Sequence, residues 1–344
     1  MRQPDSHILN RPDARLRRRH FLGGTAALIA AVSIFGHGPA MAQEYPDKPI
    51  RVIVPFPPGG STDTASRIMS ESLSGIMKQT FVIENKSGAA GTIGTASLTR
   101  AKADGYTLGI GPVGSTIISK LIGMQVPYDP VNDLIPIGNI GSLPLVVAVK
   151  ADLPVNSLAD LVELAKSKPG KLSYGTSGAG TPGHLAFEYF KDLAGIDIVH
   201  VAYRGDSPLT TDMLGGQLEV GILTGPAAAA QVASGKMKYL AVTSGQRYPQ
   251  LPDVPTVIES GYKDFNIEIW NLLIAPSATD PKILQKLNEA MNTFLQQDKA
   301  KTTLKAQGYL PPVLMSLEEV KKFVAADRKK WETIVKTTGV RIGD

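Results

Sequence analysis

Apolar and polar positions alternate along the chain in a way that predicts strands and helices in turn. Residues 50–54 form a short apolar run, and between 62 and 77 the apolar positions Ala65, Met69, Leu73 and Ile76 recur at helical spacing. Strands that alternate with helices are typical of an α/β fold with parallel crossovers. The first series comprises predicted strands 50–54, 81–85 and 106–110 and predicted helices 62–77 and 93–103.

A second βα series follows a turn-rich segment at 127–136. The apolar stretch 143–149 leads into this series, and a second stretch, 267–275, is apolar apart from Glu268 and Asn271. Within the series we expect strands 172–174, 197–202, 220–223 and 239–242 and helices 158–166, 184–193 and 208–214.

Two amphipathic helices, 280–297 and 317–337, close the chain without strands of their own, so they need a sheet to cover. The pattern therefore predicts two α/β domains joined by two crossing strands, 143–149 and 267–275. Domain 1 would comprise residues 43–145 and 267–344, and domain 2 residues 146–266. Two-domain hinge proteins of this kind bind a ligand between the domains and close over it.

The first 42 residues predict a cleaved export signal. Arg17-Arg18-Arg19 precedes an apolar stretch at 23–35, which is too short for a comfortable membrane span, and Ala40-Met41-Ala42 is a small-x-small cleavage site. Paired arginines followed by x-Phe-Leu resemble a twin-arginine signal, and ordinary Sec export is the alternative. We expect cleavage after Ala42 and a mature chain in the periplasm.

The positive charge of the chain belongs to this leader. The net charge is +5, from 36 Lys and Arg against 31 Asp and Glu, but six arginines and only two acidic residues precede residue 43. The remaining 30 basic and 29 acidic residues give no electrostatic case for binding nucleic acid. The absence of cysteine excludes disulfides, thiolate metal sites and a cysteine nucleophile.

Three glycine-rich turns between predicted strands and helices can bind an anion. In the turn 57–63, Ser61 or Thr62 can cap the next helix, while the adjacent glycines let a ligand approach the backbone. The free N–H groups and the dipole of the first helical turn then favour negative charge. The turn 174–182, in which Thr181 is the expected cap and Pro182 the first helical residue, repeats this arrangement, and 87–94 is the third turn.

Two interpretations of these turns remain open. If the first two turns face each other, each can hold one carboxylate of a dicarboxylate; otherwise they are ordinary βα turns. Arg204, after the strand 197–202, can bind a carboxylate or pair with Asp206 at the surface. Tyr203 can offer its hydroxyl or ring to the ligand, and Phe56 an apolar wall.

Enzymatic alternatives have weak support in the sequence. The glycines at 88, 91 and 94 miss the dinucleotide fingerprint, and Ser177 lies in a motif that resembles a nucleophile elbow but ends in alanine. A periplasmic hydrolase using Ser177 and His184 is the alternative from another class. The mature chain has only two histidines, His184 and His200, without metal-binding spacing, so we expect no metal, no cofactor and no catalytic residues.

The order of several motifs resembles one known family. The opening, YPxKPIRVIVPFxPGGxxD at 45–63, is similar to that of the solute-binding receptors of tripartite tricarboxylate transporters, also called the Bug family. The resemblance continues through NKxGAxG at 85–91, DGYTL at 104–108, YGxSGxGT at 174–181, YRG at 203–205, LGGQ at 214–217, DVPT at 253–256, and GY at 261–262 and 308–309.

This resemblance implies a type II periplasmic binding protein, a Venus flytrap with two hinge strands. It also implies a receptor that delivers a di- or tricarboxylate, or an aromatic carboxylate, to a membrane permease. In the family, backbone groups and two ordered waters hold the carboxylate near the first βα turn, and the second domain contributes the Gly-Ser-rich turn. We expect a monomer, with a ligand sensor for a signalling partner as an alternative role. Carried over by position, the ligand-binding residues are Phe56, Pro58, Gly59, Gly60, Ser61, Asp63, Ala90, Gly91, Thr176, Ser177, Gly180, Thr181, Tyr203 and Arg204.

Overall fold

The structure is a computed structural model that describes residues 45–342, which from Pro46 onwards belong to one compact unit. The export signal predicted for residues 1–42, with its cleavage after Ala42, lies outside the described residues. None of the helices in the described part of the chain is long and apolar enough to cross a membrane.

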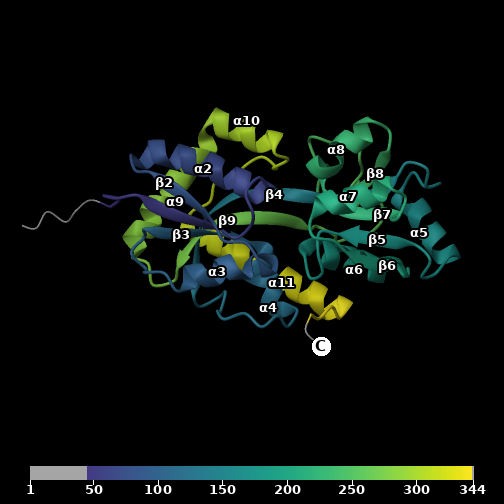
Figure 1. Cartoon of the computed structure of the whole chain (residues 1–344), viewed down its shortest axis with the longest axis horizontal. Helices are drawn as coiled ribbons and strands as arrows, with labels where there is room; N and C mark the ends of the chain where they lie inside the picture. The colour runs from purple at the N-terminus through teal and green to yellow at the C-terminus, as the bar shows by residue number, and fades with distance from the viewer. Residues whose placement is uncertain (1–44, 343–344) are drawn as a thin grey trace, which may run out of the picture. The chain divides into compact units, whose positions relative to one another are not determined.

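The first βα series builds one half of a mixed sheet, which we call sheet A. Strand β1 (Ile50–Val54) lies between β2 (Phe81–Asn85) and β3 (Thr107–Pro112), and all three are parallel. Next to β3, the antiparallel strand β9 (Glu268–Pro276) pairs with β4 (Leu134–Lys150). Figure 1 shows the helices α2 (Ser61–Met77) and α3 (Thr92–Thr99) on opposite faces of sheet A. Opposite faces are what two crossovers of the same hand require when the chain moves from β1 to β2 and then back across β1 to β3.

The second series builds the other half, sheet B, onto the far end of β4. The strands β7 (Val220–Thr224) and β8 (Met237–Val242) are antiparallel to β4, and β5 (Ser173–Thr176) and β6 (Val199–Ala202) continue parallel to β7. The helices of this half are α5 (Leu158–Ser167), α6 (Pro182–Ala194), α7 (Asp206–Leu214) and α8 (Gly225–Ala233). As Figure 1 shows, β4 and β9 connect the two halves.

A buried threonine joins β4 to the residue before β9, at the point where β4 passes from sheet A to sheet B. The hydroxyl of Thr243 donates to the carbonyl of Ile267 at 2.6 Å and accepts from the N–H of Leu145 at 2.8 Å. The backbone N–H of Ile267 in turn donates to the carbonyl of Thr243 at 2.8 Å. These bonds fix β4 and the start of β9 side by side at one point between the sheets.

The strand directions make the carboxyl ends of the two sheets face each other. Strand β3 runs antiparallel to β9, and β9 antiparallel to β4, so β1, β2 and β3 all run in the direction of β4. In contrast, β5, β6 and β7 run against β4. The turns after β1, β2 and β3 therefore point towards sheet B, and the turns after β5, β6 and β7 point back towards sheet A.

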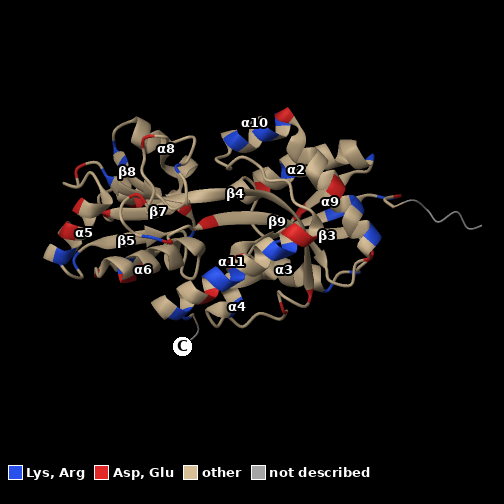
Figure 2. Ribbon diagram, turned by 180° about the vertical axis from the view of Figure 1, so that it is seen from behind, with Lys and Arg blue, Asp and Glu red and all other residues tan. Residues whose placement is uncertain are grey.

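The pattern predicted that both C-terminal amphipathic helices cover the first half of the sheet; the first of them does so, whereas the last also packs on the second half. Helix α9 (Pro281–Gln296) packs on α2 and β4, and α11 (Leu317–Thr338) packs on β4, α9 and also α6. Within the charged run 327–330 of α11, Asp327 is buried and accepts hydrogen bonds from both tryptophans of the protein. Figure 2 shows basic and acidic residues interspersed along α5, α9 and α11.

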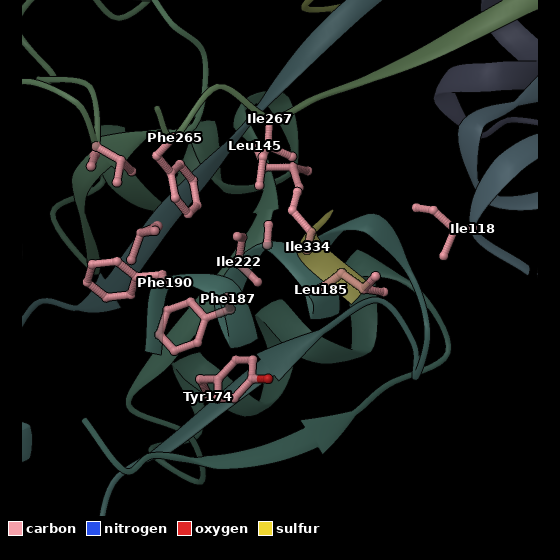
Figure 3. Packing of buried hydrophobic residues seen from close by; sticks show 14 of the residues in the cluster. Ile118, Leu145, Tyr174, Leu185, Phe187, Phe190, Ile222, Phe265, Ile267 and Ile334 are labelled. Carbon is pink, nitrogen blue, oxygen red and sulfur yellow. The ribbon is translucent and has the colours of Figure 1, made fainter. Parts of the chain in front are cut away.

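The core of the second half forms around an aromatic stack. Tyr174 stacks on Phe187 with ring centroids 4.1 Å apart, and Phe190 meets Phe187 edge to face. Figure 3 shows this stack continuing through Leu185 and Ile222 towards Leu145 and Ile267 on the connecting strands. The apolar residues that recur at helical spacing in α6 thus cover β5 and β7.

Some elements differ from the prediction. Strand β4 begins at Leu134, inside the segment 127–136 that was predicted to form turns. The strand can include Pro136 because a β-bulge between Pro136 and Gly138 interrupts the regular pairing there. The short helical segments at 114–121, α8 and α10 (Asp298–Ala306) were missed. Helix α8 is an alanine run without polar periodicity, and α10 buries only Ala300 and Leu304, so neither has a clear apolar stripe.

Candidate functional site

The turn between β1 and α2 presents open backbone at the start of a long helix. Gly60 is the N-cap and has no side chain to cap the first N–H groups, so the prediction of a Ser61 or Thr62 cap is wrong. The Thr62 hydroxyl donates instead to Asn271 Oδ1 at 3.2 Å. Around Gly59, whose φ is +90°, and around Gly60, no atom lies within 4 Å of where a Cβ would be. The first turn of α2 is therefore accessible to an anion.

Asp63 holds this turn in place. Its side chain is buried and accepts hydrogen bonds from Gly59 N at 2.9 Å, from Asn85 Nδ2 at 2.8 Å, and from Arg67 Nε and Nη2 at 2.9 and 3.0 Å. Burial raises the pKa of Asp63, but the hydrogen bonds from Arg67, Asn85 and Gly59 outweigh burial and lower the pKa below its ordinary value. The carboxylate stays charged and turns towards the protein, so it orders the glycine turn from beneath.

The turn after β2 packs against the first turn. The four residues from Gly88 to Gly91 all have positive φ, including Ala89 at 44° and Ala90 at 53°. An alanine in this region costs about 1–2 kcal/mol, so the surrounding structure must enforce the conformation. A Cβ at Gly91 would lie 3.6 Å from the ring of Phe56 and 3.6 Å from Ser115. Phe56, Gly91 and Ser115 thus meet at the carboxyl end of sheet A.

The turn between β5 and α6 is tightly hydrogen-bonded. Thr181 caps α6 by accepting from His184 N at 3.4 Å, with Pro182 at the start of the helix, as predicted. The hydroxyl of Thr176, which is fully buried, bonds to Gly178 O at 3.0 Å and to His200 Nε2 at 2.8 Å. Because Thr181 and a proline occupy the first turn of α6, this turn has fewer free N–H groups than the turn at α2.

Two stacked histidines support the same turn. The rings of His184 and His200 lie 3.9 Å apart, and Gly180 N donates to His184 Nδ1 at 3.0 Å. Burial lowers the pKa of His184, and burial together with His184 lowers the pKa of His200 to about 4. Both rings are therefore neutral near pH 7, and the Nδ1 atom of His184 is held as a hydrogen-bond acceptor.

Beyond β6, Tyr203 and Arg204 lie beside the β5–α6 turn. Gly205 N donates to Ser177 O at 3.1 Å, which ties the two turns together. The Tyr203 hydroxyl donates to Asp212 Oδ2 at 2.9 Å, and Arg204 is exposed. Asp206 accepts a hydrogen bond from the hydroxyl of Thr224, on β7, at 2.9 Å.

Exposure divides the predicted site residues into two groups. Pro58, Gly59, Gly60, Ser61, Ala90 and Arg204 are exposed, and Phe56, Ser177, Thr181 and Tyr203 are half-buried, so all of these can meet a ligand. Asp63, Gly91, Thr176 and Gly180 are buried, and they shape the turns from within.

Two cavities, of about 270 and 320 Å³, lie beside α11 and α6, and none of the predicted site residues lines them.

The structure adds residues that the sequence analysis did not place at the site. Asn271 on β9 and Tyr309 after α10 are both buried and hydrogen-bonded to each other, and they contact the first turn of α2. The signal for Asn271 was present, since Asn271 and Glu268 are the two polar residues of an otherwise apolar strand. Ser115 lies in the sequence Gly-Pro-x-Gly-Ser at 111–115, which spans the end of β3 and the start of the next helical segment and marks the end of the strand.

Two half-sheets that share a strand, with the turns at their carboxyl ends facing each other, define the class of two-lobed periplasmic binding proteins. A sequence profile described as "Tripartite tricarboxylate transporter family receptor" matches residues 65–340. The chain belongs to this family of receptors.

Individual relatives agree with this assignment. The chain is 35% identical over 321 residues to Protein BugT of Bordetella pertussis, an alignment that covers 92% of this chain and 98% of the relative. It is similar to the structure of R. palustris Rpa4515 with adipate, with 34% identity, a TM-score of 0.79 and coverage of 87% of this chain and 99% of that chain. MatC from Rhodopseudomonas palustris with bound malate gives 27% identity, a TM-score of 0.75 and coverage of 85% and 100%.

Proposed function

We propose that this protein is a periplasmic receptor that captures a small carboxylate between the turns of sheets A and B and delivers it to a membrane permease. The observation that carries the proposal is the convergence of the strand ends. The turn after β1, with its uncapped helix start, points towards the turns after β5 and β6. An uncapped helix N-terminus flanked by glycines suits an anion and leaves a neutral small molecule without a strong partner.

The two sides of this site have different roles in our proposal. The first turn of α2 offers free N–H groups and holds one carboxylate, together with Ser61 and the backbone near Ala90. On the other side, Ser177, Thr181, Tyr203 and Arg204 close over the rest of the ligand. Thr181 and Pro182 leave few free amides on α6, so contacts to the distal group come mainly from side chains. Adipate and malate, the ligands in the two related structures, are both dicarboxylates.

The domain boundaries follow from the same arrangement. We propose that residues 43–145 and 267–344 form one rigid domain and residues 146–266 the other. Leu145 and Ile267, at the proposed boundaries, are the residues that Thr243 bonds. A hinge at this point leaves the hydrogen bonds within each domain intact during closure.

Export and delivery complete the proposal. A leader cleaved after Ala42, recognised as a twin-arginine or a Sec signal, places the mature protein in the periplasm as a monomer. Its partner is the permease of a tripartite tricarboxylate transporter. Intact mass spectrometry of protein from the periplasm tests the cleavage site, and a mature chain that does not begin at Gln43 contradicts it.

Isothermal titration calorimetry with a panel of carboxylates tests the binding function. Adipate, malate, citrate and benzoate form the panel, and the corresponding primary amides or alcohols serve as uncharged controls. We expect at least one acid to bind with a Kd in the micromolar range or below, and its uncharged analogue to bind at least tenfold more weakly. A folded protein that binds no member of the panel, or that binds the amide as well as the acid, contradicts the proposal.

We also propose that the protein is a receptor without catalytic activity. His184, the base that a Ser177 hydrolase would need, accepts the Gly180 N–H at Nδ1 and stacks on His200. Its ring therefore serves the structure of the turn. Turnover of chromogenic esters that disappears in Ser177→Ala, with ligand binding retained, would overturn this part of the proposal.

A further inference from the structure

A partly buried ring of hydrogen bonds connects the proposed carboxylate turn to the connecting strand β9. Thr62 Oγ1 donates to Asn271 Oδ1 at 3.2 Å, Asn271 Nδ2 donates to Tyr309 Oη at 2.9 Å, and Tyr309 Oη donates to Ser61 O at 3.4 Å. The hydrogen bonds all run in one direction, from Thr62 through Asn271 and Tyr309 to Ser61, so each bond strengthens the next. The ring begins and ends on the first turn of α2.

The Tyr309 side chain fits closely against the connecting strands. It is 1% exposed, and a Cβ at Gly141 of β4 would lie 2.5 Å from its ring. Gly141 is the partner of Asn271 in the β4–β9 pairing, and the following residue of the tail, Leu310, donates its N–H to Ser142 O at 2.9 Å. Tyr309 is thus fixed to β4 and β9, next to the proposed carboxylate turn.

The preceding residue is held from the other side by elements of sheet B. Tyr248 Oη donates to Gly308 O at 2.6 Å, and Gln250 Nε2 donates to Lys305 O at 3.0 Å. Gly308 has a φ of +88°, and a Cβ there would lie 2.5 Å from Cγ of Pro226, at the start of α8. Tyr248 itself packs in the apolar cluster of sheet B with Val146 and Leu223.

From these contacts we propose that Tyr309 is a positioning residue. It couples the contact of Gly308 with Tyr248 and Pro226 to the geometry of the proposed carboxylate turn. This inference rests on the proposed function. When the two halves approach, Tyr248 and Pro226 hold Gly308. The adjacent Tyr309 then holds Ser61 directly and Thr62 through Asn271. When Gly308 is released, the first turn of α2 loses this support. Closure and a high affinity for the carboxylate are thereby linked.

The experiment compares three variants that each remove one buried hydroxyl. Tyr309→Phe keeps the ring against Gly141 and removes the two hydrogen bonds of Oη. Tyr248→Phe breaks the contact to Gly308 O, far along the chain from α2. Thr279→Val is the matched control, because its buried hydroxyl donates to Pro276 O at 2.7 Å in the β9–α9 turn, outside the ring. Kd for adipate and malate is measured by calorimetry, and Tm without ligand by differential scanning calorimetry.

We expect Tyr309→Phe and Tyr248→Phe each to raise Kd about tenfold, and the double variant to raise it by less than the product of the two. Thr279→Val should lower Tm while it leaves Kd within twofold of the wild type. A merely structural role of Tyr309 predicts a lower Tm with an unchanged Kd, and that result overturns the proposal. Additive effects of the two tyrosine variants on ln Kd also overturn it, since independent sites do not couple.

A second measurement needs no ligand. Hydrogen exchange of the peptide spanning residues 60–66 should become at least threefold faster in Tyr248→Phe and unchanged in Thr279→Val. Unchanged exchange in Tyr248→Phe overturns the coupling even if Tyr309→Phe does not fold. If the wild type binds no carboxylate, the proposed function fails and the coupling to a carboxylate fails with it. If the wild type binds and the tyrosine variants bind equally well, only the coupling fails.

Discussion

Trp270 and Trp331, the two tryptophans of the protein, donate hydrogen bonds to one carboxylate oxygen of Asp327, at 2.8 and 2.9 Å. Trp270 lies on the connecting strand β9 beside Asn271, and Trp331 lies one turn beyond Asp327 on α11. All three side chains are buried, and Lys330 forms an ion pair with the other oxygen of Asp327. This contact fixes the C-terminal helix to the strand that connects the two halves.

Asp327→Ala should therefore destabilise the protein strongly. It leaves two buried indole N–H groups without an acceptor, and each such group costs about 1–3 kcal/mol. We expect the free energy of unfolding to fall by about 3 kcal/mol, measured by urea denaturation with circular dichroism. The control is Asp298→Ala, since that side chain is almost fully exposed and should change the free energy by less than about 0.5 kcal/mol. Equal losses of the free energy of unfolding in both variants would show that the hydrogen bonds from the two indoles to Asp327 do not stabilise the protein.

Gly180→Ala should be far more harmful than Gly195→Ala. Both glycines have positive φ, 70° and 61°, so both substitutions carry a similar backbone strain of about 1–2 kcal/mol. A Cβ at Gly180, however, would lie 2.4 Å from Cδ1 of Ile342 and 2.6 Å from Cδ1 of Ile122, whereas Gly195 has no atom within 4 Å. Relief of the clash requires these two isoleucine side chains to move or the β5–α6 turn to shift away from α4 (Ser119–Leu121) and the C-terminal tail.

We expect Gly180→Ala to lower Tm more than Gly195→Ala and to weaken carboxylate binding at least tenfold. The double variant Gly180→Ala/Ile342→Ala should recover part of both losses, because it removes the atom closest to the new methyl group. Calorimetry of the wild type, the two single variants and the two double variants with Ile342→Ala measures both quantities. If Ile342→Ala also restores Tm and binding in the Gly195→Ala variant, the effect of Ile342 does not depend on its contact with residue 180.

Stability should fall as the pH is lowered from about 6.5 to about 4. The pKa of His200 falls from an ordinary value of 6.5 to about 4 on folding, mainly through burial, and the pKa of His184 is lowered in the same direction. In this window the unfolded chain binds protons that the folded protein does not, so the free energy of unfolding decreases as the pH falls. The stabilisation is fully present above about pH 6.5.

Urea denaturation at several pH values measures this effect. His200→Asn should flatten the curve between about pH 6.5 and 4. The further loss below about pH 4 should remain, because Asp129, whose pKa is lowered to about 2 mainly by its hydrogen bond from Val131 N, titrates there. A wild-type curve that is flat between about pH 6.5 and 4 would contradict neutral, buried histidines in the fold.

Asp63→Asn should weaken carboxylate binding about tenfold, although it removes a negative charge near the bound anion. The substitution replaces the charged acceptor that orders Gly59, and charge-assisted hydrogen bonds are about twice as strong as neutral ones. Glu71→Gln, on the exposed face of the same helix, is the control and should leave Kd unchanged. Tighter binding in Asp63→Asn would show that the charge of Asp63 matters more for binding than the hydrogen bonds it accepts.

The sequence pattern predicted the structure correctly in segments where the local preference of the residues agrees with their place in the tertiary structure. The strands Ile50–Val54 and Phe81–Asn85 are confirmed without change, and the Thr181 cap with Pro182 in the first turn of α6 is confirmed as well. In these segments the apolar period, the turn glycines and the cap all lie within a few residues of one another. The family, too, could be recognised from motifs whose order alone is characteristic.

Contacts between distant segments could not be derived in this way. The length of β4 depends on pairing with β9, more than 120 residues later, and the burial of Asp327 depends on Trp270. The same holds for the Thr62–Asn271–Tyr309 ring, in which three separate segments meet. A charged run or a lone asparagine has the same local pattern whether it is solvated or buried with partners.

The sequence by itself determined the alternating α/β elements, the glycine turns and the receptor family, because short-range periodicity and backbone preference are written in neighbouring residues. Only the tertiary structure decided which turns face one another and which polar side chains support them. Strand direction within a mixed sheet is set by pairing between distant segments, and a buried hydrogen bond exists only when both partners have been brought together.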